Sequence, residues 1–241
     1  RRPSSHGWPS GFPLYLGAGC KNNCSYCCTA GIFDGKYNLR RVAYGIEDIR
    51  SAIRIKSFAG FFDSNIYNNR DYLINLCNRI IENNLKFSWG AQVTVDIGDD
   101  VECLDLMKTA GCKILFLGLE TLNEKNLEIL NKNYSASNYL RLVTNIRKKG
   151  FYIVGYFIFG LDFDTKETFT TTLNFIKKSH IHLPLFNLLI PVPGTKLYDK
   201  LKIENRLLIN DANELEKENP IYSVPCNKCL FVPKNLSVEE A

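Results

Sequence analysis

The sequence predicts an α/β fold in which parallel strands are covered by helices. Six short apolar segments, rich in β-branched and aromatic residues, alternate along the chain with segments of helical periodicity. The apolar segments are continuous rather than alternating, which is typical of strands buried on both faces. Right-handed crossovers would curl such a series into either a barrel or a doubly wound sheet, and periodicity does not choose between these two.

The predicted elements follow in chain order. Residues 1–13 contain three prolines and are expected to be a lead-in loop, and residues 31–44 are expected to be irregular. The six strands are predicted at Leu14–Leu16, Phe58–Phe62, Phe87–Val93, Ile114–Gly118, Tyr152–Phe159 and Leu185–Ile190. The helices are predicted at Ile46–Ile55, Tyr72–Ile81, Val101–Met107, Leu127–Leu130, Tyr139–Ile146 and Thr165–Lys178, with a last one starting at Leu197–Leu201.

Length, charge and composition narrow the class of protein. The 241 residues suit one large domain or two small ones, and 45% hydrophobic residues can bury a sizeable core. The net charge of +5 is mild and forms no dense basic patch, so no nucleic-acid partner is expected. No apolar run is long enough to span a membrane and no signal peptide is visible, which predicts a cytoplasmic protein without a membrane partner.

The ends of the chain predict a piece of a longer protein. The sequence begins at Arg1 rather than at a methionine, and residues 237–241 resemble a helix start that is cut short. Residues 206–241 are expected to form a C-terminal extension to the α/β unit, which would occupy residues 14–205.

A cluster of cysteines follows the first predicted strand. Cys20, Cys24 and Cys27 have the spacing C-x3-C-x2-C, and Tyr26 precedes the third. Clustered cysteines in a reducing compartment more often hold metal than form disulfides, and the odd total of nine argues against a secreted disulfide framework. A structural zinc ion needs four protein ligands. Three thiolates on a four-iron cluster would leave one iron open to a small ligand.

Polar residues stand where several predicted strands end. The carboxyl ends of parallel strands meet at one edge of a sheet, where binding sites of such folds form. Two of these groups also have a purely structural interpretation: Asp63–Asn65 could be a turn, and Glu120 could cap the helix that begins near Asn123. The strand-end residues are Asp63, Ser64, Asn65, Gln92, Glu120 and Gly160.

The cysteine motif resembles the signature of the radical S-adenosylmethionine (SAM) superfamily. Further stretches are similar to the branch of that superfamily whose members commonly carry an upstream cobalamin-binding domain; they are residues 61–65, 118–121, 155–160, 191–198 and 230–236. No such domain fits before Cys20, so cobalamin is expected only if a part missing from this chain supplies it.

This resemblance implies a partial (βα)6 TIM-like barrel with a short C-terminal extension. It implies a [4Fe–4S] cluster held by Cys20, Cys24 and Cys27, with SAM on the open iron. It also implies reductive cleavage of SAM to a 5′-deoxyadenosyl radical, which would abstract hydrogen from a substrate that the sequence does not identify. The residues expected around SAM are Tyr26, Asp63, Ser64, Asn65, Gln92, Glu120, Ile158 and Gly160.

The reaction and the partners stay open on this reading. Methylation, epimerisation and cyclisation are all compatible with hydrogen abstraction, and the substrate could be a small molecule or a peptide. The electron donor is expected to be a flavodoxin or a ferredoxin. No catalytic acid or base stands out.

An alternative interpretation is a zinc-stabilised binding module without enzymatic activity. The two C-x2-C pairs Cys24/Cys27 and Cys226/Cys229 have the spacing of a four-cysteine zinc site. This interpretation leaves Cys20 without a role and does not use the strand-end residues. Cys226 and Cys229 could otherwise help to hold a second cluster, whereas Cys77, Cys103 and Cys112 are expected to be packing residues.

Overall fold

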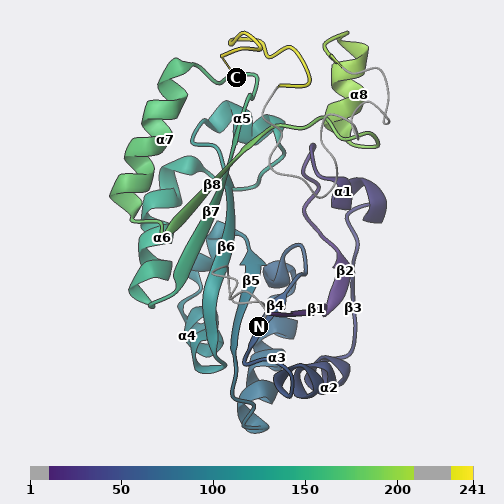
Figure 1. Ribbon diagram of the computed structural model, residues 1–241, viewed down its shortest axis with the longest axis vertical. Helices are drawn as coiled ribbons and strands as arrows, with labels where there is room; N and C mark the ends of the chain where they lie inside the picture. The colour runs from purple at the N-terminus through teal and green to yellow at the C-terminus, as the bar shows by residue number, and fades with distance from the viewer. Residues whose placement is uncertain (1–10, 209–228, 241) are drawn as a thin grey trace, which may run out of the picture.

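The structure is a computed structural model that describes residues 11–208 and 229–240. Six strands form one sheet in which every neighbouring pair is parallel, in the order β1-β4-β5-β6-β7-β8. This order confirms the predicted parallel α/β class (Figure 1). The strands of this sheet are β1 (Phe12–Leu14), β4 (Phe58–Phe61), β5 (Ser88–Val93), β6 (Cys112–Glu120), β7 (Tyr152–Phe159) and β8 (Leu183–Leu188).

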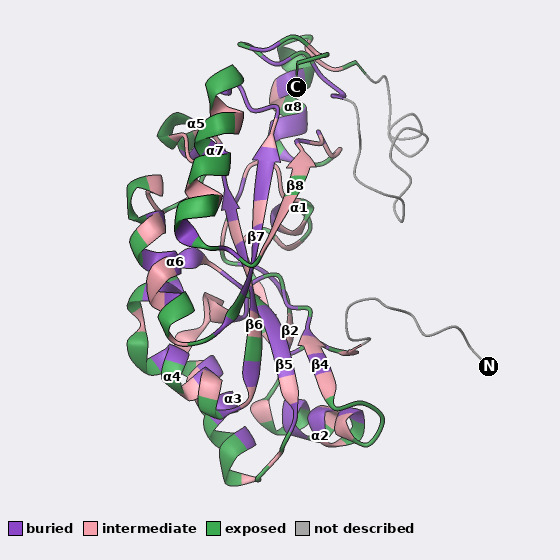
Figure 2. Cartoon of the chain, turned by 60° about the vertical axis from the view of Figure 1, so that its left-hand side comes forward, coloured by how far each residue is buried: buried purple, intermediate pink, exposed green. Residues whose placement is uncertain are grey.

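Helices connect successive strands, and α4, α6 and α7 cover one side of the sheet (Figures 1 and 2). Several begin at a side chain that accepts a hydrogen bond from the first turn, as Asn69 does for α3 and Thr195 for α8. The helices are α2 (Val42–Ile53), α3 (Arg70–Glu82), α4 (Val101–Thr109), α5 (Glu124–Ile129), α6 (Tyr139–Lys148), α7 (Lys166–Ser179) and α8 (Lys196–Ile203), with 3₁₀ turns η1 (Ile66–Asn68), η2 (Val95–Asp99) and η3 (Ala136–Asn138). Among the described residues, no helix is long and apolar enough to cross a membrane.

The main core lies between the sheet and its helices. Trp89, Tyr139 and Phe157 are fully buried there, and the indole nitrogen of Trp89 donates a hydrogen bond to the carbonyl of Ala110 at 2.8 Å. Large aromatic side chains of this kind supply much of the buried area of a domain. The same core contains the buried side chains of Cys77, Cys103 and Cys112, which confirms their predicted packing role.

A second part of the fold stands on the opposite side of the sheet from α4, α6 and α7. There β2 (Gly17–Gly19) and β3 (Tyr37–Leu39) form an antiparallel pair, and α1 (Cys28–Phe33) lies between them in the chain (Figure 1). None of these three elements was predicted. The Gly-Ala-Gly sequence of β2 has low strand propensity, and six residues are too few to reveal the period of α1.

Two predicted strands are displaced along the chain. The first and last strands of the sheet end two residues earlier than expected, at Leu14 and Leu188. In the first case, Leu16 is buried just before β2 and so continues the apolar run beyond β1. Most of the predicted lead-in loop, residues 1–10, lies outside the described residues.

The C-terminal residues pack at the same end of the molecule as α5 and α8 (Figure 1, yellow). An antiparallel bridge joins Leu207 to Phe231, and the half-buried side chain of Arg206 forms an ion pair with Asp162. A small apolar cluster at this end contains Leu130, Ile158, Leu161, Leu189, Leu197, Leu201, Cys229 and Phe231. The described C-terminal residues Cys229 and Phe231 therefore pack against Ile158 and Leu189 near the carboxyl ends of the later strands.

Candidate functional site

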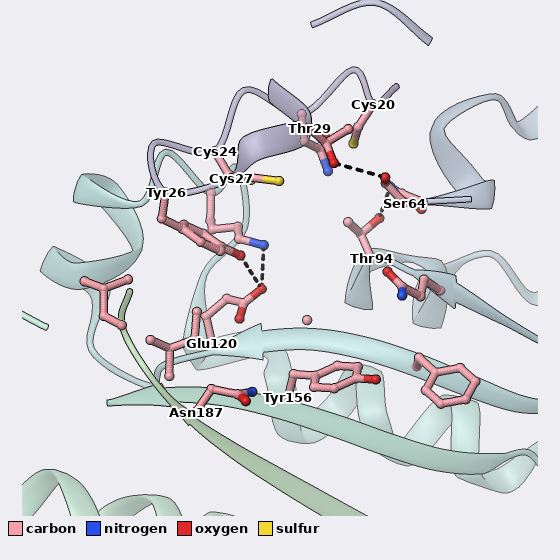
Figure 3. A pocket seen from close by; sticks show the side chains of 18 of the residues that line it. Cys20, Cys24, Tyr26, Cys27, Thr29, Ser64, Thr94, Glu120, Tyr156 and Asn187 are labelled. Carbon is pink, nitrogen blue, oxygen red and sulfur yellow. Dashed lines mark hydrogen bonds and ion pairs between the residues drawn. The ribbon is translucent and has the colours of Figure 1, made fainter. Parts of the chain in front are cut away.

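A cavity of about 560 Å³ opens at the carboxyl ends of the strands (Figure 3). Its walls come from the cysteine loop, from the residues that follow β4 and from β5 to β8. The predicted residues that line it are Cys20, Cys24, Tyr26, Cys27, Ser64, Asn65, Gln92, Glu120 and Ile158. Side chains outside the predicted set of site residues also line it, among them Asn22, Thr29, Thr94, Lys132, Tyr134, Tyr156 and Asn187.

The cysteine loop is anchored at both ends by the β2–β3 pair. Gly19 ends β2 with φ at +98°, and a Cβ there would lie 2.0 Å from the carbonyl oxygen of Lys36, so only glycine fits immediately before Cys20. The middle of the loop is tied to the barrel through Ser25. Its N–H donates to the carbonyl of Leu130 at 3.1 Å, and its carbonyl accepts from the N–H of Leu197 at 2.9 Å.

The three cysteines supply a donor set that fits an iron–sulfur cluster. Cys20 and Cys24 are buried, Cys27 is half-buried, and none is in a disulfide. Burial raises the pKa of the Cys24 thiol, although Lys132 opposes this rise. The thiolate form of Cys24 would be stabilised by binding a metal cation. Among the described residues, no three His, Cys, Asp or Glu side chains converge on one metal-ion position. A four-iron cluster does not require convergence, because each thiolate binds a different iron.

A buried ion pair lines the same cavity as the cysteines. Glu120 is 5% exposed, and its Oε1 accepts from the Tyr26 hydroxyl at 2.8 Å and from Lys132 Nζ at 2.8 Å (Figure 3). The Lys132 ammonium also lies 5.6 and 5.7 Å from the ring centroids of Tyr26 and Tyr134.

Burial and the neighbouring charges set the protonation states of Lys132 and Tyr26. Burial lowers the pKa of Lys132, but Glu120 and the neighbouring phenols raise it by more, so this pKa lies well above its usual value. Burial and the Glu120 carboxylate together raise the pKa of Tyr26. Lys132 therefore carries its positive charge at neutral pH, and Tyr26 keeps its proton.

The backbone at Glu120 is unusual. Its φ is +63°, in the left-handed region, and the β6–β7 register shifts between Gly118 and Glu120. Such irregularities redirect a side chain and concentrate at functional sites. The helix-cap interpretation of Glu120 is wrong, because Asn123 caps α5 with its own side chain while the Glu120 carboxylate is engaged by Lys132.

Asp63 does not line the cavity, contrary to its predicted place beside SAM. Its carboxylate accepts from the N–H groups of Leu16 at 3.0 Å and Gly17 at 2.8 Å, and from the Tyr37 hydroxyl at 2.9 Å. Burial raises the Asp63 pKa, and these hydrogen bonds oppose the rise. Asp63 thus fixes the β2–β3 base of the cysteine loop. Gly160 is also absent from the lining, since it follows β7 with φ at +83° and has no side chain to project.

The zinc-site interpretation finds no support at Cys229. This residue is buried in the apolar cluster of the C-terminal end, and its Sγ is 3.1 Å from the carbonyl oxygen of Phe231, to which it donates. Its proposed partner Cys226 lies outside the described residues.

Lys132 is the most consequential residue that sequence reasoning missed. It follows α5 in a polar stretch, Asn131–Asn133, where a lysine would be expected in solvent. Its side chain is only 8% exposed, and only the fold brings it to Glu120. Its one sequence signal is its place shortly after the strand-end Glu120.

Comparison with known proteins identifies the family. The sequence model of the Radical SAM superfamily matches residues 14–176. The chain belongs to this superfamily. Membership confirms the predicted cofactors, a [4Fe–4S] cluster and SAM, and with them an enzyme that needs a reductant. The zinc-stabilised binding module is not favoured.

Two of the curated relatives are enzymes named for methyl transfer. Bacteriochlorophyllide d C-12(1)-methyltransferase from Chlorobaculum tepidum is 30% identical over 195 residues, which is 79% of this chain and 42% of the relative. Hopanoid C-2 methylase from Rhodopseudomonas palustris is 29% identical over 208 residues, covering 83% of this chain and 40% of the relative. The chain thus spans less than half the length of these relatives.

Solved structures confirm the fold. The radical SAM methyltransferase TsrM from Kitasatospora setae, with cobalamin and a [4Fe–4S] cluster bound, superimposes with a TM-score of 0.74 at 20% identity. The superposition covers 81% of this chain and 40% of that one. The predicted TIM-like partial barrel is therefore confirmed, and so is the similarity to the cobalamin-associated branch.

Proposed function

We propose that this chain is the radical SAM unit of an enzyme that modifies an unactivated C–H bond, with methylation as the reaction best supported. The observation that carries the proposal is the presence of all three motif cysteines and the buried Lys132–Glu120 pair around one cavity. The barrel unit would occupy residues 14–205, with residues 206–241 as its extension. A flavodoxin or ferredoxin would supply the electron, in the cytoplasm.

Cys20, Cys24 and Cys27 would hold the cluster, and the cavity would hold SAM beside it. When bound, these two cofactors supply the one-electron cleavage of SAM to methionine and a 5′-deoxyadenosyl radical. The chain's own task is to position the cofactor and to exclude water. Ser64 and Asn65 would contact the methionine end of SAM.

The opposite wall of the cavity would hold the nucleoside end of SAM. The Tyr26 ring and Ile158 would contact the adenine. Glu120 would accept hydrogen bonds from the ribose hydroxyls, because only Oε1 is used by Tyr26 and Lys132 and a carboxylate has further acceptor sites. Lys132 would hold the Glu120 carboxylate in place for that purpose, and Gln92 would line the wall between the two ends of the cofactor.

The inner face of the sheet suggests the substrate class. A second cavity of about 210 Å³ adjoins the first and shares Gln92, Phe116 and Tyr156 with it. The Phe116 and Tyr156 rings are stacked, with centroids 6.4 Å apart, and Gly60 and Gly90 line the cavity without side chains. Such a surface favours a flat apolar ring system. The relatives named above, a bacteriochlorophyllide methyltransferase and a hopanoid methylase, are named for substrates of that kind.

The proposal of methylation rests on these relatives. Another relative is a cyclase, so cyclisation is the second candidate reaction. The anaerobic magnesium-protoporphyrin IX monomethyl ester cyclase of Cereibacter sphaeroides is 27% identical over 193 residues, covering 78% of this chain and 31% of the relative. Cobalamin would enter the reaction only if a part of the parent protein beyond this chain binds it.

The test is anaerobic reconstitution with iron and sulfide, reduction, and addition of SAM. Wild-type protein is expected to form 5′-deoxyadenosine and methionine, and Cys20→Ala is expected to form neither. Cys77→Ala is the matched control, because this thiol is buried in the main core away from the cavity. A fully loaded four-iron cluster that cleaves no SAM would contradict the proposed chemistry, and a colourless zinc protein would contradict the cluster itself.

The substrate class has its own readout. Addition of a porphyrin or a polycyclic triterpene should increase SAM turnover in wild-type protein, and Tyr156→Ala should weaken that stimulation. Equal stimulation by a charged peptide would argue against an apolar ring as the substrate.

A further inference from the structure

One hydrogen bond joins the cysteine motif to the residues that follow β4. The side-chain amide of Asn68 donates from Nδ2 to Cys20 Sγ at 3.1 Å. Cys20 is 7% exposed, and Asn68 stands at the end of the 3₁₀ turn η1. A buried sulfur that accepts from a fixed amide is in a different electrostatic state from one that faces water. This contact has no part in the site roles described above.

The direction of this hydrogen bond is fixed by its neighbours. The backbone N–H of Tyr67 donates to Asn65 Oδ1 at 3.0 Å, which leaves the Asn65 amide nitrogen to act as donor. That nitrogen donates to Asn68 Oδ1 at 3.1 Å. Because the Asn68 oxygen is occupied in this way, its NH2 group is turned toward Cys20. A main-chain donor therefore sets the orientation of both amides in the series.

Asn68 has no capping duty that would explain this geometry. The neighbouring residue, Asn69, caps α3 by accepting from Tyr72 N at 3.1 Å. The turn η1 is capped by Asn65. The Asn68 side chain thus bridges the first amide of the series to the sulfur.

Hydrogen bonds to cysteine sulfur are one of the factors that set the reduction potential of an iron–sulfur cluster. A donor to a ligating thiolate stabilises the more negative, reduced cluster more than the oxidised one. We infer that Asn68 is a positioning residue that raises the reduction potential of the cluster through its hydrogen bond to Cys20. This inference rests on the proposed function, since it requires Cys20 to be a cluster ligand.

The series also reaches the cavity. Asn65 and Thr94 both line it, and the Asn65 amide nitrogen is 3.4 Å from Thr94 Oγ1. A molecule bound in the cavity beside Asn65 would therefore contact the same series of hydrogen-bonded amides that ends at Cys20.

The experiment is a redox titration of the reconstituted chain, followed by the electron paramagnetic resonance signal of the reduced cluster. Asn68→Leu removes the donor, so its midpoint potential should shift downward from that of wild type. Asn68→Asp keeps the shape but places an acceptor beside the sulfur, so its downward shift should be larger. The matched control is Asn133→Leu, which replaces an exposed asparagine and should titrate like wild type.

Each outcome separates this inference from the function it rests on. A wild-type chain that assembles no four-iron cluster would contradict the proposed function before Asn68 is considered. A cluster that forms normally in all variants but titrates at the wild-type potential in Asn68→Leu and Asn68→Asp would overturn the inference alone. Loss of the cluster in both Asn68 variants, with Asn133→Leu intact, would assign Asn68 to assembly instead and would also overturn it.

Discussion

Replacing Lys132 with methionine removes the positive charge beside Glu120 while keeping most of the volume of the side chain. Both partners are buried, at 8% and 6% side-chain exposure, and their charged atoms lie 2.8 Å apart. Removing one partner of a buried ion pair leaves an uncompensated charge and typically costs about 3–5 kcal/mol. We therefore expect Lys132→Met to lower the free energy of unfolding by an amount in that range.

The assay is urea unfolding of the reduced protein without its cluster, so that loading does not enter the result. Lys149→Met is the control, because Lys149 forms an ion pair of 2.6 Å with Asp105 at the surface, where such pairs contribute about 0–1 kcal/mol. The double variant Lys132→Met/Glu120→Gln should recover part of the loss. A neutral amide at position 120 needs no counter-charge, and its oxygen still accepts from Tyr26.

The pH dependence of this effect follows from the raised pKa of Lys132. A group whose folded pKa lies above its unfolded value, about 10.4 for lysine, stabilises the fold below that value and loses the contribution only as pH rises beyond it. In the wild-type protein, the contribution of the Lys132 charge to stability should thus be the same at pH 6 and pH 8. A cost no greater than that of Lys149→Met, or a double variant no more stable than the single one, would refute the reasoning.

Three further predictions follow from buried groups. Asp63→Ala removes three hydrogen bonds that hold the base of the β2–β3 pair, so it should lower the free energy of unfolding by about 2–4 kcal/mol. It should also lower the iron content without changing the SAM affinity of the loaded fraction. Weaker SAM binding at full iron content would contradict this prediction. Burial raises the pKa of Asp164 to about 6. The protonated carboxyl therefore stabilises the folded state fully below pH 4, and this contribution to stability is lost as pH rises through 6. The stability of wild type relative to Asp164→Asn should fall by up to about 3 kcal/mol between pH 4 and pH 7 in thermal or urea unfolding, and a constant difference would argue against the shift. Cys229→Ala should leave four irons per chain and SAM cleavage unchanged, because Cys229 packs in an apolar cluster; loss of iron would indicate a second cluster.

The sheet was predictable because strands buried on both faces appear in the sequence as continuous apolar segments. Tyr152–Phe159 was predicted with the bounds that β7 has, and Phe58–Phe62 differs from β4 by one residue. The same reasoning fails at β2, where Gly17 and Gly19 carry no apolar side chain. That strand exists because β3 pairs with it and Asp63 binds its first N–H group, and both partners are distant in sequence.

The strand-end rule identified the correct edge of the sheet but not the direction of every side chain. Glu120 and Asp63 both follow apolar strands, and both were expected beside SAM. The positive φ of Glu120 turns its carboxylate toward Lys132 at the cavity. The carboxylate of Asp63 instead receives the N–H groups of Leu16 and Gly17. Which of two similar residues faces the cavity depends on local backbone angles, and a single sequence does not contain them.

Reading the sequence alone was enough to predict the class of fold, the soft three-thiolate ligand set and the edge of the sheet where the site forms. These features depend on hydrophobic period and on spacing within short segments, which are local properties of the chain. The pairing of Lys132 with Glu120 and the hydrogen bond from Asn68 to Cys20 are visible only in the folded chain. Asn68 and Cys20 are 48 residues apart in the chain, and only folding of the barrel brings them together.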